Sequence, residues 1–240
     1  MYSLKHKVTY SEISADKHIS IAQAVRYFQD TSTFQSEAVG DTIEELEKKQ
    51  CAWLLSAWQL EVDRYPVFGE ELTISTWPYD SKGILAYRNF EMKDADGNSI
   101  IRANSIWFYF DSQTGMPRKI LPEYVESYGD GEKLPMNYKG RKVILPKNVE
   151  GKKMDHFPVK KSDLDTNGHV NNSKYIEMAS EYVEKTSAIK GMRVDYRKSA
   201  TINDTIVPVI YEEANYIYVE LSNGEIPFAV IEFEMDGEDK

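Results

Sequence analysis

The chain has 240 residues, of which 12% are aromatic and 28% charged, a composition that argues against disorder and fits one large globular domain or two smaller ones. Its single cysteine excludes a disulfide framework and a zinc site made only of cysteines, and it fits a reducing compartment. The net charge of -10 argues against a general nucleic-acid binder.

The first elements expected along the chain are an extended stretch over 4–10 and a helix that follows it. The helix is indicated by residues at one-face spacing, namely Ala24, Val25, Phe28 and Ser32. A second, shorter helix is expected to begin with Asp41 as its N-cap and Glu44 in the capping-box position. Four segments rich in Val, Ile, Tyr, Trp and Phe then predict strands over 51–63, 71–79, 84–93 and 99–111.

The segment that follows these strands is strongly basic. Residues 133–161 contain nine Lys and Arg against two acidic residues, a net +7, so the rest of the chain carries -17. Three prolines and the lack of a sustained period make this segment a connector rather than a domain. It is either a solvated linker or a docking surface for an acidic partner, since local charge can steer encounter against an opposing net charge.

Behind the connector the same order of signals occurs a second time. An extended stretch over 157–161 leads into a polar turn and then a helix, one face of which is formed by Tyr175, Met178, Ala179, Tyr182 and Val183. Strands are expected over 191–198, 205–212, 216–222 and 226–235. His18 and His169 align without a gap through this block. The sequence therefore predicts a tandem α+β array, each half a long helix followed by antiparallel strands.

Asp165, Asn167 and His169 alternate just before the second helix. If this approach is extended, the three side chains point to one side. There His169 can take a proton near neutral pH, the Asn167 amide can donate to a developing oxyanion or hold a water, and Asp165 can orient either of them. The start of the helix, near Asn171 or Asn172, adds backbone donors and the positive end of a dipole. The competing interpretation is plain turn and N-cap chemistry.

Five segments across nearly the whole chain resemble the acyl-acyl-carrier-protein thioesterases of plants and bacteria, in the family's order. They are Glu12-Ile-Ser-Ala-Asp-Lys-His-Ile-Ser-Ile, Val62-Asp-Arg-Tyr-Pro-Val-Phe-Gly-Glu, Arg102-Ala-Asn-Ser-Ile-Trp-Phe, Asp163-Leu-Asp-Thr-Asn-Gly-His-Val-Asn-Asn-Ser-Lys-Tyr-Ile-Glu and Val194-Asp-Tyr-Arg-Lys. The resemblance implies an α+β tandem (double) hotdog, in which each half is a long helix wrapped by an antiparallel β-sheet. It places an N-terminal hotdog with the acyl-chain pocket over 1–115, a basic connector over 116–154 and a C-terminal hotdog with the catalytic motif over 155–240. The implied activity is hydrolysis of fatty acyl-acyl carrier protein, which releases free fatty acid and ends chain elongation without a cofactor.

The resemblance assigns catalysis to three residues of the longest segment: Asp165, Asn167 and His169. The chain departs from the family where Ser199-Ala200 replaces the usual Glu-Cys pair, so neither a cysteine nor a carboxylate stands there. The only cysteine, Cys51, opens a strand in the other half, and cysteine is most often a small buried hydrophobe. We therefore expect direct attack by a water held by the motif, with assistance from Asp195 or Ser199.

The resemblance also places the acyl chain in the first half. We expect its lining on the helix and the first long strand, namely Ile21, Val25, Phe28, Trp53 and Trp58; core packing is the alternative for each. The implied partner is acyl carrier protein, an acidic protein that presents the chain as a phosphopantetheine thioester. Its docking residues are expected in the basic connector: Lys139, Arg141 and Lys142.

Rival functions at this point are an acyl-CoA thioesterase or a hydratase on a hotdog scaffold, and a non-catalytic acyl-binding module. The four histidines have no metal-ligand spacing, so no metal site is expected. We expect a cytoplasmic protein that contacts neither nucleic acid nor membrane, because the chain start lacks an apolar export signal and no apolar run is long enough to span a bilayer. A tandem chain can satisfy hotdog pairing internally, so a monomer and a homodimer both fit.

Overall fold

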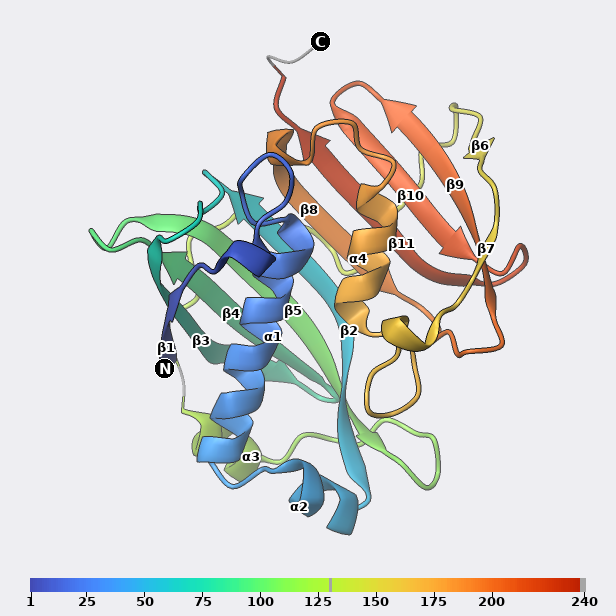
Figure 1. Ribbon diagram of the computed structural model, residues 1–240. Helices are drawn as coiled ribbons and strands as arrows, with labels where there is room; N and C mark the ends of the chain where they lie inside the picture. The colour runs from blue at the N-terminus through green and yellow to red at the C-terminus, as the bar shows by residue number, and fades with distance from the viewer. Residues whose placement is uncertain (130, 238–240) are drawn as a thin grey trace.

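The computed structural model describes residues 1–129 and 131–237. Within them, an antiparallel sheet of 11 strands carries the helices α1 (Ile21–Ala38) and α4 (Asn172–Ser180) side by side on one face (Figure 1). Two shorter helices, α2 (Ile43–Lys48) and α3 (Pro122–Tyr128), lie near the end of α1. No helix of the described residues combines the length and the apolar character needed to cross a bilayer.

The predicted strands are confirmed, with small shifts at their ends. Those of the first half are β1 (Tyr2–Lys7), β2 (Cys51–Val62), β3 (Glu71–Lys82), β4 (Leu85–Lys93) and β5 (Ser99–Asp111). Those of the second half are β7 (Phe157–Pro158), β8 (Ile189–Tyr196), β9 (Thr205–Glu213), β10 (Tyr216–Ser222) and β11 (Pro227–Met235). The predicted connector adds one short strand that was not expected, β6 (Lys152–Lys153). Single 3-10 turns lie at Tyr10–Glu12, Lys161–Asp163 and Thr186–Ala188.

The sheet runs in the order β1-β3-β4-β5-β2-β8-β11-β10-β9-β6, with β7 paired to β9. The two halves join where β2 meets β8, and residues 57–61 pair with residues 191–195. Each half curls its strands around its own helix, which is the tandem hotdog architecture expected from the sequence (Figure 1). The β2–β8 pair makes one continuous sheet of the two hotdogs, so a single chain satisfies the pairing at that edge.

The main core lies between α1, α4 and the sheet. The inner face predicted for α1 is confirmed, since Ala24, Val25, Phe28 and Ser32 are all buried. The ring of Phe28 lies 6.2 Å from that of Trp58 and 5.2 Å from that of Phe90. Burial of a large apolar side chain contributes about 1.5–3 kcal/mol, so this cluster holds α1 against the sheet.

The predicted cap of α2 is wrong. The helix begins after Thr42, whose hydroxyl accepts a hydrogen bond from the Glu45 N–H at 3.2 Å. Asp41 is instead buried, and its carboxylate accepts hydrogen bonds from the Trp53 indole and the Tyr128 hydroxyl. Both Asp and Thr cap helices well, so the choice between them was made by side chains distant in sequence.

The second long helix is shorter than predicted. α4 has 9 residues, whereas α1 has 18. The N–H groups of Tyr182 and Val183 bond to carbonyls three residues back, and this tight turn ends the helix after Ser180. Val183 still enters the core from the turn, at 5% exposure. The apolar face predicted for this helix therefore extends past its end at Ser180, to Val183 in the turn.

The basic connector crosses the face of the sheet that the helices leave free. On β8, Met192 and Val194 belong to the helix-side core, so Arg193 between them points to the opposite face. There its guanidinium donates to the carbonyls of Gly140 at 2.6 Å and Lys142 at 2.7 Å. The connector is therefore hydrogen-bonded to the sheet along this stretch.

The same segment contacts the first half. The Gln59 side chain on β2 donates to the Asn137 carbonyl at 2.6 Å and accepts from the Lys139 N–H at 2.9 Å. The connector thus binds both halves across the β2–β8 junction. The division into 1–115, 116–154 and 155–240 stays a prediction, and residues 130 and 238–240 of it lie outside the described residues.

Candidate active site

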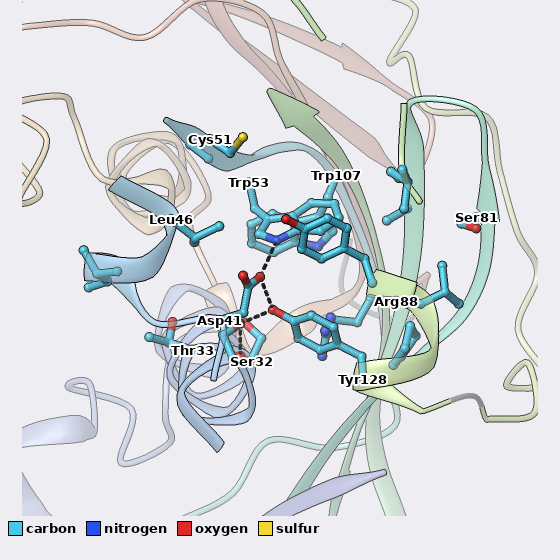
Figure 2. Close-up of a pocket in the computed structure, with 18 of the residues that line it drawn as sticks. Ser32, Thr33, Asp41, Leu46, Cys51, Trp53, Ser81, Arg88, Trp107 and Tyr128 are labelled. Atoms are coloured by element: carbon cyan, nitrogen blue, oxygen red, sulfur yellow. Dashed lines mark hydrogen bonds between the residues drawn. The ribbon is translucent and has the colours of Figure 1, made fainter. Parts of the chain in front are cut away.

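A cavity of about 360 Å³ opens in the first half, within the usual range of about 300–1,000 Å³ for small-molecule sites. Its walls come from α1, α2, α3 and the strands β2 to β5 (Figure 2). The apolar lining includes Leu46, Trp53, Ala86, Trp107, Ile120 and Val125. The polar lining includes Ser32, Ser36, Asp41, Ser81, Arg88 and Tyr128.

The second half completes this cavity, because Thr166 and Asn167 belong to its lining. Both residues come from the turn before α4. The side chain of Arg26 on α1 forms an ion pair with Glu177 and donates to the Ser173 hydroxyl at 3.3 Å, which keeps α4 beside α1. The candidate site therefore lies between the two hotdogs and needs both.

The turn over 165–169 is not the extended segment expected from the alternation of its polar residues. The Asp165 N–H donates to the His169 carbonyl at 2.7 Å, and Gly168 adopts a φ of 75°, which glycine accepts without strain. The Asp165 carboxylate accepts from the backbone N–H groups of Asn167 at 2.8 Å and His169 at 3.2 Å. Asn167 and His169 are exposed, and no hydrogen bond joins the His169 imidazole to another described residue. The Asp165 carboxylate thus holds the shape of the turn by binding backbone N–H groups within it.

The start of α4 has fewer free backbone donors than the sequence suggests. Asn171 caps the helix and accepts from the Ser173 N–H at 2.9 Å, while its own N–H donates to the Asp163 carbonyl at 2.8 Å. The Lys174 N–H donates to the Asn171 carbonyl at 2.9 Å. Since these donors are occupied, the residues of this segment that border the cavity with a side-chain donor are Thr166 and Asn167.

Ser199 and Ala200, which stand where the family has Glu-Cys, lie beside the turn. The Ala200 carbonyl accepts from the Val170 N–H at 2.9 Å, and the Ala200 N–H donates to the Tyr175 hydroxyl at 2.8 Å. Ser199 is exposed at this point. The structure therefore brings Ser199 next to the motif.

Asp195 lies on the other face of the sheet. Its neighbours Val194 and Tyr196 pack in the helix-side core, so the Asp195 side chain points towards the connector. There its carboxylate accepts from the Arg197 guanidinium at 3.0 Å. The sheet thus stands between Asp195 and the turn that carries His169.

Trp53 lines the cavity, and its indole N–H donates to the Asp41 carboxylate at 3.1 Å. The other residues predicted to contact the acyl chain lie in the core outside this lining: Ile21, Val25, Phe28 and Trp58. Core packing accounts for their burial, and their contact with substrate stays a prediction.

Cys51 also lines the cavity and is buried. Its thiol donates to the Lys49 carbonyl at 3.2 Å and accepts from the Arg118 guanidinium at 2.9 Å. Neither group can take the thiol proton, so these contacts give a cysteine nucleophile no base. The described residues hold no group of three or more His, Cys, Asp and Glu placed to bind a metal ion.

The lining residues that were not singled out in the sequence as parts of the site include Asp41, Arg88 and Tyr128. Figure 2 shows Asp41 between Trp53 and Tyr128. The sequence held a signal for Arg88, because this residue shares its strand face with Phe90 and Met92, both of which are fully buried. An arginine at a core position of a strand calls for a partner.

The predicted docking residues are partly engaged within the protein. The Lys139 ammonium lies 3.5 Å from the Glu232 carboxylate and 3.4 Å from that of Glu234. Arg141 donates to a serine hydroxyl on β2 at 2.9 Å, whereas Lys142 is exposed. The fold therefore neutralises part of the connector's charge, and Lys142 is the most accessible of the three.

Two domain families match the chain in the order of its halves. Residues 1–128 match the acyl-ACP thioesterase N-terminal domain, and residues 146–229 match the acyl-ACP thioesterase C-terminal domain. The chain belongs to the acyl-ACP thioesterase family. In this family member, the N-terminal match holds most of the cavity and the C-terminal match holds the turn over 165–169.

Relatives of this acyl-ACP thioesterase family member include plant proteins. A palmitoyl-acyl carrier protein thioesterase, chloroplastic, of Arabidopsis thaliana is 28% identical over 205 residues, which cover 78% of this chain and 49% of that protein. An oleoyl-acyl carrier protein thioesterase 1, chloroplastic, of the same plant is 22% identical over 85% of this chain and 62% of its own length. The chain spans about half of the length of several plant relatives that it matches.

Solved structures share the fold. An acyl-ACP thioesterase from Bacteroides thetaiotaomicron superposes with a TM-score of 0.87 at 22% identity, over 97% of this chain and 96% of that one. A 12:0-ACP thioesterase from Umbellularia californica superposes with a TM-score of 0.84 at 19% identity, also over 97% and 96%. The tandem hotdog is therefore common to this chain and both enzymes.

Proposed function

We propose that this protein hydrolyses the thioester of fatty acyl-acyl carrier protein, releasing free fatty acid and ending chain elongation. The observation that carries the proposal is the place of Asn167, which belongs to the motif of the second half and lines the cavity of the first. This arrangement suits an acyl chain that lies in the first half with its thioester at the turn. Family membership and the acyl-acyl carrier protein substrates named for the plant relatives support the same substrate class.

In the proposed mechanism, the thioester carbonyl lies beside Asn167. His169 takes a proton from a water while the water oxygen attacks the carbonyl carbon. The Asn167 amide donates to the oxyanion that forms, and Asp165 holds both residues through their backbone N–H groups. The intermediate then collapses, the C–S bond breaks, and the proton on His169 passes to the departing thiolate. The products are a fatty acid and the carrier thiol.

Of the two assisting residues, Ser199 is the better placed, because Ala200 next to it is hydrogen-bonded to the motif. Asp195 faces the connector on the other side of the sheet from the turn. In this proposal it therefore takes no part in the hydrolysis and acts only within the sheet. Attack by water makes Cys51 dispensable. Loss of hydrolysis in a folded Cys51→Ala protein would refute the water mechanism.

Acyl carrier protein is the proposed partner, docked on the basic connector. Lys142→Glu should raise KM for carrier-bound substrate and leave KM for the matched acyl-CoA unchanged. Lys139→Glu and Arg141→Glu are weaker tests, because they also break contacts with Glu232, Glu234 and β2. An unchanged KM in Lys142→Glu would return the connector to a purely structural role.

The function is tested by thiol release from acyl-acyl carrier protein and from acyl-CoA of matched chain length, across a series of chain lengths. We expect release from the carrier substrate at the higher kcat/KM. Higher kcat/KM with CoA substrates would make the protein an acyl-CoA thioesterase. A hydrated product that keeps its thioester would indicate a hydratase, and binding without release a non-catalytic module.

We place the protein in the cytoplasm within this proposal, on the strength of its single cysteine. The Arabidopsis relatives are named as chloroplastic proteins, so the chloroplast is the alternative to the cytoplasm. Fractionation of the source cells decides between them. Light scattering of the purified chain distinguishes a monomer from a homodimer.

A further inference from the structure

Arg88 is a buried cation in the wall of the cavity. It lies on β4 and is 9% exposed. Its Nη1 donates to the side chains of Gln35 and Thr76, the latter at 3.1 Å, and its guanidinium lies 5.2 Å from the centre of the Tyr128 ring. Figure 2 shows Arg88 beside Tyr128 at the cavity. All three of these neighbours are neutral groups.

Among the side chains that the structure describes, which exclude those of residues 123, 130 and 238–240, no carboxylate lies within the 4.0 Å ion-pair distance of Arg88. The buried carboxylate of the cavity, Asp41, is engaged by the Trp53 indole, the Tyr128 hydroxyl and the Lys49 ammonium, the last at 3.5 Å. The other carboxylates of the lining are on exposed residues: Glu37, Glu47 and Asp80. Among the described side chains, therefore, no neighbour balances the charge of Arg88.

An arginine without a counter-ion is rarely buried, because the charge loses its hydration. Burial lowers the pKa of Arg88 to about 10, which leaves the guanidinium charged at neutral pH. A pocket for a plain hydrocarbon chain gains nothing from such a charge. Arg88 therefore indicates a ligand group that a saturated chain lacks.

Arg88 and Asn167 line the cavity from different halves of the chain. The sheet order β4-β5-β2-β8 separates β4 from β2 by two strand spacings, about 10 Å. Asn167 comes from the turn before α4, in the second half, which joins the first where β8 pairs with β2. An acyl chain with its thioester at Asn167 thus meets Arg88 only with its distal part.

We propose that the cavity accepts acyl chains that carry an oxygen function on their distal part, a hydroxyl or a carboxylate, and that Arg88 donates to this oxygen. The inference rests on the proposed function, since it specifies the acyl group of that same thioester substrate. Nη1 is engaged by Gln35 and Thr76, and no hydrogen bond joins Nη2 or Nε to another described residue, so these two nitrogens can donate to the ligand. Ser81, also in the lining, carries a second polar group.

The test measures binding without hydrolysis, through the fluorescence of Trp53 and Trp107 in the cavity lining. Three ligands of matched length are compared over a series from octanoate to hexadecanoate: a methyl alkanoate, a methyl ω-hydroxyalkanoate and the monomethyl ester of the α,ω-dicarboxylic acid. The ester stands in for the thioester and removes the carboxylate that a free fatty acid would present at that end. We expect an oxygenated ester to bind about 10- to 100-fold tighter than the plain ester of the same length, the range for one hydrogen bond to a charged group. The tighter of the two oxygenated esters identifies the hydroxyl or the carboxylate as the natural group.

Arg88→Met removes the donor with a side chain of similar length, and it should abolish this preference while the plain ester binds as well or better. Arg88→Lys keeps the charge and should retain part of the preference. Arg64→Met is the control, because it removes an arginine that pairs with Glu70 and Asp94 outside the cavity lining. Circular dichroism and Tm verify the fold of each variant.

Equal or tighter binding of the plain ester to the wild-type protein overturns the proposal, whether or not the variants fold. A preference that survives in folded Arg88→Met overturns it as well. Thiol release from acyl-acyl carrier protein is measured separately. Absent release overturns the proposed function and leaves the binding preference readable, whereas release without a preference refutes only the role of Arg88.

Discussion

The turns before α1 and before α4 share one backbone and differ in their surroundings. Each is closed by an N–H to carbonyl bond of 2.7 Å, from Ser14 to His18 in the first and from Asp165 to His169 in the second. Each contains one residue with positive φ, 68° in the first and 75° in the second. The second turn borders the cavity and the first does not. The repeated local structure therefore creates two equivalent turns, and tertiary packing distinguishes them.

The side chains of the two turns also differ, and this difference too favours the second turn for the proposed chemistry. In the first, the His18 imidazole is hydrogen-bonded to the Asp16 carbonyl at 2.9 Å, and Asp16 occupies the position of the Asn167 amide. In the second, no hydrogen bond joins the His169 imidazole to another described residue. A histidine held by its own turn and a missing amide make the first turn unsuitable for the proposed chemistry.

The two helices explain why the cavity lies in the first half. The additional turns of α1 carry Ser32 and Ser36, which line the cavity. The chain after α4 turns back early and returns Val183 to the core. The longer helix, together with α2 and α3, encloses space at the end of the first hotdog.

The largest effect is expected from making the second turn resemble the first. Asn167→Asp removes the amide donor and places a negative charge where the oxyanion forms. The kcat for acyl-acyl carrier protein should fall about 10²–10³-fold, the range for one oxyanion donor. The matched variant Asp16→Asn should leave kcat unchanged. A near-normal kcat in Asn167→Asp would remove Asn167 from the site.

A smaller effect is expected from Asp165→Ser, which introduces the residue found at this position in the first turn. The variant loses the carboxylate that accepts from the N–H groups of Asn167 and His169. We expect kcat to fall about tenfold and the free energy of unfolding to fall by about 1–2 kcal/mol, as for loss of a capping side chain. Steady-state kinetics and urea denaturation measure the two. Loss of stability at constant kcat would make Asp165 purely structural.

Tyr175, on the helix after the second turn, makes the stability of the second half sensitive to high pH. The first half has Ala24 at this position and lacks the effect. Burial raises the pKa of Tyr175 from 10.0 to about 12. Below pH 10 the group is neutral in both states and its stabilisation is complete. Between pH 10 and 12 the unfolded chain loses the proton first, so stability is lost as pH rises.

Tyr175→Phe should therefore lose about 2–3 kcal/mol less stability than the wild type between pH 10 and 12, since one pKa unit corresponds to about 1.4 kcal/mol. Urea denaturation at a series of pH values measures the difference. Tyr10→Phe, at an 80% exposed position, is the control and should follow the wild type. Parallel curves for Tyr175→Phe and the wild type would contradict the burial argument.

The smallest effect is expected from the two helix caps. Ser20 accepts from the Gln23 N–H at 3.1 Å and Asn171 from the Ser173 N–H at 2.9 Å. Ser20→Ala and Asn171→Ala should each lower the free energy of unfolding by about 1 kcal/mol. Only Asn171→Ala should also lower kcat, because it lies two residues from His169. Equal kcat in the two variants would show that the start of α4 does not position the motif.

Much of the fold could be predicted because its signals are local. Segments rich in Val, Ile, Tyr, Trp and Phe predict each long strand, and one-face spacing predicts α1. The geometry of the motif could not be predicted from alternation alone. The carboxylate of Asp165 competes for the backbone N–H groups of its own turn, so the segment closes instead of extending.

The sequence by itself determined the two halves, the strands, the family and the place of the motif over 165–169, because each depends on side chains close together along the chain. Only the tertiary structure decided which residues line the cavity. Its lining joins helices and strands that are far apart in sequence, and it consists of the faces that remain uncovered after these elements pack. In that packing Asp41 binds the Trp53 indole instead of capping α2, and Cys51 lies beside Arg118. Arg88 lies in the cavity wall, with no opposing charge among the described side chains.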